Sequence, residues 1–125
     1  MATSPTQRTL KKMRGDGYVC QTVERWCSFS RRRIDLWSCI DVLCLHEDHG
    51  GVTGVQTTSA SNLSKRKAKI LGSEEMRLFI ECGNRMFLHG WRKGGPKGKR
   101  KTWICNETQI RLCDFQELNN VPAMP

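Results

Sequence analysis

The fold is decided by the stretch Ile34-Asp35-Leu36-Trp37-Ser38-Cys39-Ile40-Asp41-Val42-Leu43-Cys44-Leu45 and, beyond a Gly50-Gly51 turn, by Gly54-Val55-Gln56-Thr57-Thr58-Ser59. We expect residues 38–45 and 52–59 to form a hairpin around the polar segment 46–51. Asp41 then lies inside an apolar strand. Burying a carboxylate among Ile, Val and Leu is costly unless a cation, a metal or a hydrogen-bond network compensates it. Asp41 is therefore the first candidate for a functional residue.

The return strand carries a polar pair two residues apart. Side chains alternate between the two faces of a strand, so Gln56 and Thr58 share one face with Val52 and Gly54. Where the register of the hairpin allows, we expect this pair to point toward the same space as Asp41.

The remaining sequence predicts a mixture of helices and strands. We expect helices at 6–14 and 64–82, the second broken near Gly72-Ser73, further strands at 18–26, 85–91 and 102–105, and basic loops at 28–33 and 92–101. A chain of 125 residues is long enough for one domain with one core. We expect a single domain over 1–125, with flexible tails at residues 1–4 and about 119–125.

Charge and composition narrow the partners. The chain has 21 Lys and Arg against 12 Asp and Glu, a formal net charge of +9. This excess favours binding to a polyanion such as nucleic acid, with an anionic membrane surface as the weaker alternative. The sequence has no long apolar run and no apolar signal core near Met1, so we expect a soluble, intracellular protein of the cytoplasm.

Seven cysteines without a Cys-x-x-Cys pair indicate small buried hydrophobic residues in a reducing compartment. Cys44, His46 and His49 leave a zinc site as an alternative, although a second ligand pair at a fixed spacing is missing. The four tryptophans are expected in the core rather than on a surface that stacks on bases.

The order of these elements resembles the core of the PD-(D/E)XK nuclease superfamily, and more closely small phage and bacterial proteins described as Holliday-junction-resolvase-like or nuclease-like. The resemblance runs over most of residues 5–105 and rests on order and spacing. The matching segments include Val23-Glu24-Arg25-Trp26, Arg33-Ile34-Asp35-Leu36, Ile40-Asp41-Val42-Leu43, Gly54-Val55-Gln56-Thr57-Thr58-Ser59 and His89-Gly90-Trp91-Arg92-Lys93. It implies an α/β (α+β) restriction-endonuclease-like αβββαβ core, with a central mixed sheet of four to five strands flanked by helices.

The resemblance also implies roles for individual residues. Asp41 matches the acid that binds the catalytic metal, Glu24 the acid from the first element, and Gln56 and Thr58 the carboxylate and lysine of the signature. The predicted catalytic set is thus Asp41, Gln56, Thr58 and Glu24, with Asp41, Glu24 and Gln56 holding Mg²⁺ or Mn²⁺. The chain departs from the pattern at two positions, because an amide brings no negative charge and a threonine supplies no cation.

Three functions compete at this point. The first is a metal-dependent DNA endonuclease or phosphodiesterase of phage or bacterial type, with branched or damaged DNA as candidate substrates and a homodimer as a candidate state. The second is a nuclease-fold protein that binds nucleic acid without cleaving it, and the third is a small basic RNA-binding or protein-interaction domain. An ordinary structural interpretation also remains, in which Asp41 pairs with Arg33 while Gln56 and Thr58 are simple strand residues. The predicted nucleic-acid contacts are Arg31, Arg32, Arg33, Lys65, Arg66, Lys69, Arg92, Lys93, Lys97, Lys99, Arg100 and Lys101.

Overall fold

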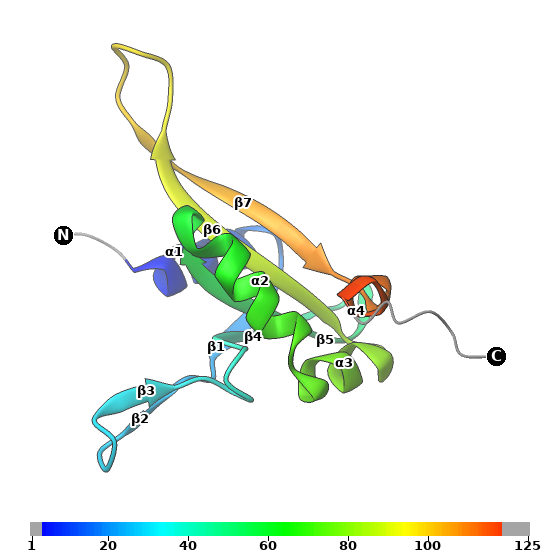
Figure 1. Ribbon diagram of the computed structural model, residues 1–125. Helices are drawn as coiled ribbons and strands as arrows, with labels where there is room; N and C mark the ends of the chain where they lie inside the picture. Colours follow the sequence, from blue (N-terminus) through cyan, green and yellow to red (C-terminus); the bar gives the residue numbers. More distant parts are fainter. Residues whose placement is uncertain (1–3, 119–125) are drawn as a thin grey trace.

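The computed structural model describes residues 4–118 of the chain (Figure 1). Its elements are, in chain order, α1 Pro5–Gly15, β1 Val19–Thr22, β2 Arg25–Cys27, β3 Arg32–Ile34, β4 Val42–His46, β5 His49–Ser59, the 3₁₀ turn η1 Ala60–Asn62, α2 Leu63–Leu71, α3 Glu74–Glu81, β6 Arg85–Gly94, β7 Thr102–Ile110 and α4 Leu112–Leu118. The tails predicted at residues 1–3 and 119–125 lie outside the described residues. Ser4, also predicted in a tail, instead caps α1: its hydroxyl accepts from the Gln7 N–H at 3.2 Å.

The central sheet has five strands in the order β1-β4-β5-β6-β7. Only β5 and β6 run parallel, and the other neighbouring pairs are antiparallel. A parallel pair needs a crossover, which α2 and α3 provide. With β2 and β3 set aside as an insertion and α2 and α3 counted as one helical segment, the order from α1 to β6 is the predicted αβββαβ. The predicted mixed sheet flanked by helices is confirmed.

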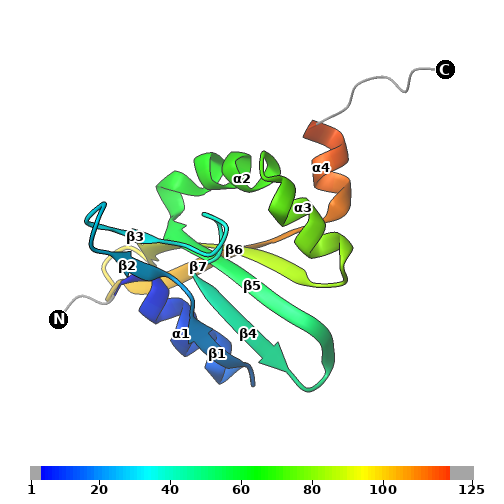
Figure 2. The same cartoon turned by 90° about the horizontal axis from the view of Figure 1, so that it is seen from below.

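Helices cover both faces of the sheet (Figure 2). On one face α1 contributes Met13 to a buried cluster with Val42, Cys44 and Val55. On the other face α2, α3 and α4 pack over a larger cluster whose buried members are Cys39, Ile40, Ile70, Met76, Phe79, Met86, Leu88, Ile110 and Phe115. The two clusters therefore hold β4 and β5 from both faces of the sheet, and the candidate site lies at the ends of these strands.

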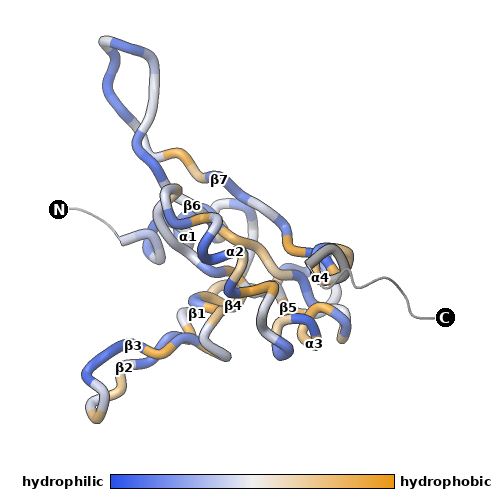
Figure 3. Tube along the Cα trace, viewed as in Figure 1, coloured by the Kyte–Doolittle hydropathy of each residue, from blue (hydrophilic) through white to orange (hydrophobic). Residues whose placement is uncertain are grey.

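Two hairpins extend away from this core (Figures 1 and 3). One is the long β6–β7 hairpin, and the other is β2–β3, a separate two-stranded sheet. Figure 3 shows that hydrophilic residues dominate β3 and the β6–β7 tip. The predicted strand 18–26 is thus divided into β1 and β2, and the predicted loop 28–33 was wrong in part, since residues 32–34 form β3.

Several other boundaries differ from the predictions. Residues 38–40 are not in a strand: residues 36–40 form a tight turn closed by a Leu36↔Ile40 bridge, and Asp41 comes just before β4. β6 and β7 are longer than predicted, and α4 was not predicted. The break near Gly72-Ser73 is confirmed, with the Ser73 hydroxyl accepting from the Met76 N–H at the start of α3. Within residues 4–118 no helix combines the length and the hydropathy needed to cross a bilayer.

Candidate active site

The turn before β4 places Asp35 opposite Asp41. Leu36 and Ile40 form an antiparallel bridge, so the residues one step outward, Asp35 and Asp41, face each other across it. The turn is tight because Trp37 and Ser38 adopt the left-handed conformation, with φ of 51° and 61°. Two consecutive non-glycine residues in this region are uncommon and cost free energy, which the surrounding packing must offset.

Glu24 reaches the same place from β1. Thr22 pairs with Val42, and the next residue, Val23, donates its N–H to the Asp41 carbonyl at 3.0 Å. Glu24 therefore enters the site at the point where the chain leaves the main sheet for β2. The site is built where three strand ends meet.

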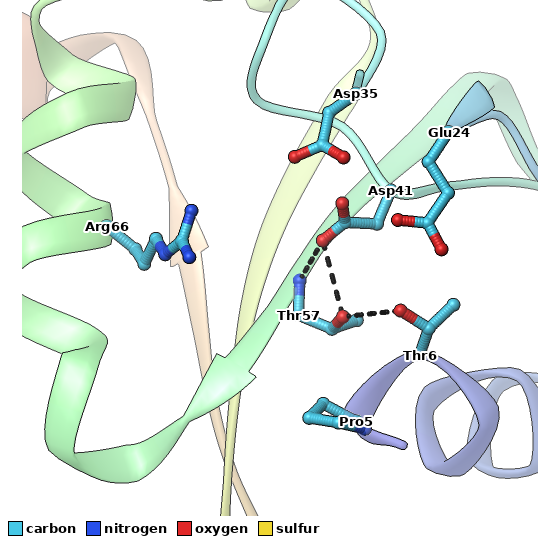
Figure 4. Close-up of a pocket in the computed structure, with 7 residues that line it drawn as sticks. All are labelled: Pro5, Thr6, Glu24, Asp35, Asp41, Thr57 and Arg66. Atoms are coloured by element: carbon cyan, nitrogen blue, oxygen red, sulfur yellow. Dashed lines mark hydrogen bonds between the residues drawn. The ribbon is translucent and has the colours of Figure 1, made fainter. Parts of the chain in front are cut away.

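The carboxylates of Glu24, Asp35 and Asp41 converge, with one oxygen of each lying within 4.8 Å of the others. They border a cavity of about 220 Å³ lined also by Pro5, Thr6, Thr57 and Arg66. Figure 4 shows the three acids on one side of this space, Thr6 and Thr57 below them, and Arg66 reaching in from α2. The cavity can hold a cation with its bound waters or one phosphate group.

Asp41 is fixed by Thr57 rather than by Gln56 or Thr58. The Asp41 Oδ2 atom accepts from the Thr57 N–H at 2.7 Å and from its hydroxyl at 3.3 Å. The Thr57 hydroxyl in turn lies 3.0 Å from that of Thr6 on α1. The expected direction of the polar pair was therefore wrong: alternation along β5 directs Gln56 and Thr58 to the face opposite the Thr57 side chain.

Gln56 is fully buried on the α2 side of the sheet. Neither its Oε1 nor its Nε2 atom has a hydrogen-bond partner within residues 4–118. Thr58 is also buried, on the same face. A role for these two residues in metal binding or catalysis stays a prediction, and what the structure adds is that they do not hold Asp41.

The electrostatics of the site favour a cation. Asp41 is 5% exposed. Its pKa is raised to about 7, chiefly by burial, then by a hydrogen bond with Asp35, and also by the charges of Asp35 and Glu24, while the Thr57 N–H acts in the opposite direction. Carboxylates this close cannot all be ionised at low cost, so they hold a proton or a cation between them.

One arginine neutralises part of the cluster. The Arg33 guanidinium donates to Glu24 at 2.9 Å, and the Arg33 side chain is 69% exposed while that of Glu24 is 13% exposed. The alternative prediction that Arg33 pairs with Asp41 was therefore wrong, because Arg33 pairs with Glu24.

Some of the predicted nucleic-acid contacts lie beside the acids, and others lie far from them. Arg66 lines the main cavity. Arg32, Arg33 and Lys69 line a smaller cavity of about 140 Å³ that shares Asp35. The six basic residues at 92–101 lie at the β6–β7 tip, away from the acids (Figure 1). All twelve predicted contacts except the partly buried Arg66 are exposed.

Three sequence expectations are corrected elsewhere in the molecule. Among residues 4–118 the three acids are the only group of three His, Cys, Asp or Glu side chains that converges, so Cys44, His46 and His49 do not form the alternative zinc site. Only Trp91 is a buried tryptophan, whereas Trp26, Trp37 and Trp103 are 61%, 49% and 42% exposed. The cysteines are free, and Cys82 and Cys113 are exposed rather than buried.

Sequence reasoning missed Asp35 and Thr57 as site residues. Asp35 stands six positions before Asp41, a spacing that no regular helix or strand turns into proximity. The available signal was its position in an apolar run like that of Asp41. Thr57 was passed over because Asp41 was placed inside a strand, whereas it lies at the end of a turn.

Compared with models of known protein families, with curated protein sequences and with solved structures, the chain gives no match in any of the three. Its function is therefore inferred from the chemistry of these residues.

Proposed function

We propose that this protein is a metal-dependent phosphodiesterase that cleaves DNA, with a PD-(D/E)XK-like core. The observation that carries the proposal is the convergence of Glu24, Asp35 and Asp41 within 4.8 Å beside a polar cavity. The αβββαβ order of the core and the net charge of +9 support it.

The donor set fits Mg²⁺ or Mn²⁺. Hard divalent cations prefer carboxylate oxygens, and Mg²⁺ keeps several waters while binding to one or two carboxylates. Glu24, Asp35 and Asp41 would hold the ion, which relieves the repulsion that otherwise keeps a proton on Asp41. A bound cation supplies polarisation of a phosphate oxygen and a water that ionises near neutral pH.

The chain itself supplies the remaining parts. The Thr57 N–H and hydroxyl hold one oxygen of Asp41, so the other stays directed into the site. Arg66 on the cavity wall binds a phosphate oxygen. In this way it takes the role that the lysine has in the nuclease signature. Arg32, Lys69 and the basic β6–β7 tip hold the flanking backbone without reading bases.

The second candidate function is a protein that binds nucleic acid without cleaving it. Neither Gln56 nor Thr58 brings the charge that the nuclease signature places at those positions. A protein with this composition can bind nucleic acid at the same cavity and leave it intact. Asp35 weighs against that alternative, since it restores a second carboxylate beside Asp41.

Incubating supercoiled plasmid with the protein in Mg²⁺, Mn²⁺ or EDTA separates the two functions. We expect nicking with either metal, none in EDTA and none by Asp41→Asn. Glu47→Gln is the matched control, because Glu47 is an exposed acid in the β4–β5 turn. Equal nicking by Asp41→Asn excludes the proposed site, and salt-sensitive binding without nicking by the wild type favours the binding protein.

A further inference from the structure

The β2–β3 hairpin exposes two aromatic side chains to solvent. Phe29, in the turn between the strands, is 99% exposed, and Trp26 on β2 is 61% exposed. Single exposed apolar residues are ordinary, but two large aromatic rings on one projecting hairpin form a surface suited to a partner with flat apolar faces. We call residues 25–34 the arginine-aromatic hairpin.

The charge of this hairpin is uniform. It contains Arg25, Arg31, Arg32 and Arg33 and no acid. Trp26 pairs with Arg33 across the two strands, so their side chains share one face, while Cys27 pairs with Arg32 on the other. Aromatic rings set among guanidinium groups match a polyanion that carries rings, which is the chemistry of a nucleic-acid strand.

The hairpin is joined directly to the acidic site. Glu24 precedes β2 and Asp35 follows β3, so both ends of the hairpin carry site carboxylates. Arg33 binds Glu24 and, with Thr6 and Glu24, lines a cavity of about 640 Å³ between the hairpin and α1. In both views the hairpin and the basic β6–β7 tip extend from the side of the molecule where α1 begins (Figures 1 and 2).

We propose that the arginine-aromatic hairpin binds a DNA strand with unpaired bases, Phe29 and Trp26 stacking on bases while Arg31 and Arg32 bind phosphates. This inference rests on the proposed function and names its substrate class. In a duplex the faces of the bases are covered by their neighbours, and only an unpaired base offers its face to a protein ring. The hairpin then places the adjoining phosphates at the carboxylates that flank it.

Binding measured in EDTA tests the hairpin without cleavage. A fluorescently labelled oligothymidine and a labelled duplex of equal length are titrated with wild type, Phe29→Ala, Phe29→Leu and Phe29→Tyr by anisotropy. Stacking on one base corresponds to about a tenfold change in affinity. We expect Phe29→Ala and Phe29→Leu to weaken single-strand binding by about that factor, Phe29→Tyr to retain it, and duplex binding to change less than twofold.

The control variant is Leu78→Ala, which removes another exposed apolar side chain, on α3. We expect it to bind as the wild type. Full single-strand affinity in Phe29→Ala, or an equal loss on both DNAs, overturns the proposal. So does full affinity in Phe29→Leu, because an apolar contact then suffices, or a change from dimer to monomer in light scattering, because the hairpin is then a protein interface.

The two proposals fail separately. If Phe29→Ala binds single strands normally while Asp41→Asn loses metal-dependent nicking, only the hairpin's role is wrong. If Phe29→Ala loses binding while Asp41→Asn nicks plasmid normally, the carboxylate site is wrong.

Discussion

Replacing Asp41 with asparagine is expected to stabilise the metal-free protein at alkaline pH. The asparagine side chain is close in size and shape to the protonated acid, with an oxygen to accept from Thr57 and an amide to donate to Asp35. The variant therefore keeps the polar contacts of the site and removes the charge that burial and the neighbouring carboxylates disfavour.

The magnitude follows from the pKa of Asp41, raised from 3.8 to about 7 in the folded protein. Between these values the folded state holds a proton that the unfolded state has released. The stabilisation is thus fully present below the unfolded pKa and is lost as pH rises through about 7. Each pKa unit corresponds to about 1.4 kcal/mol, so Asp41 costs the wild type up to about 4 kcal/mol at about pH 8.

Urea denaturation of both proteins in EDTA, from about pH 4 to about pH 9, measures this difference. We expect the two free energies of unfolding to be similar near pH 4 and the variant to be more stable by about 2 to 4 kcal/mol near pH 8. Added Mg²⁺ should stabilise the wild type near pH 8 and leave the variant unchanged. Curves separated by a constant amount at every pH would show that Asp41 is not the desolvated acid described above.

Two further predictions concern the same site, and a third concerns the buried Gln56. Manganese affinity, measured by calorimetry, should fall about tenfold per pH unit below about pH 7, because the cation must displace the proton held at Asp41; a flat profile would contradict this. Arg33→Gln should bind Mn²⁺ several-fold more tightly while losing under about 1 kcal/mol of stability, since the exposed guanidinium competes for Glu24. Weaker binding of Mn²⁺ would instead show that Arg33 helps Glu24 to bind the metal. Gln56→Met should raise the free energy of unfolding by about 1 kcal/mol, because it removes a buried amide without partners in residues 4–118. A decrease of similar size in the free energy of unfolding would mean that the Gln56 amide has hydrogen-bond partners in solution.

The sequence was most informative where local chemistry decides the structure. The break between α2 and α3 lies at Gly72-Ser73 as predicted, and the Ser73 side chain caps α3. These features depend on contacts three or four residues apart. The mixed sheet was predicted from the resemblance alone, and the helical crossover between β5 and β6 is what makes that pair parallel in the structure.

The site was only partly accessible from sequence. Asp41 and Glu24 were predicted and lie together, but Asp35 joins them through a turn whose Trp37 and Ser38 adopt conformations that these residue types rarely favour. Whether Asp41 meets Thr57 or Gln56 depends on whether Asp41 lies within the strand or before it. A shift of one residue along a strand moves a side chain to the opposite face of the sheet. The arginine run 31–33 indicated a loop by composition, although Arg32 and Arg33 pair with β2.

The most direct test of the account is the rate at which Asp35→Asn nicks supercoiled plasmid in Mg²⁺. Asp35 was not predicted from the sequence and is a site residue only because of where the structure places it. If the three carboxylates form one cation site, the rate should fall by about a hundredfold or more, with DNA affinity in EDTA unchanged or higher. A rate within twofold of the wild type, from a wild-type protein that itself cleaves in Mg²⁺, would contradict the account.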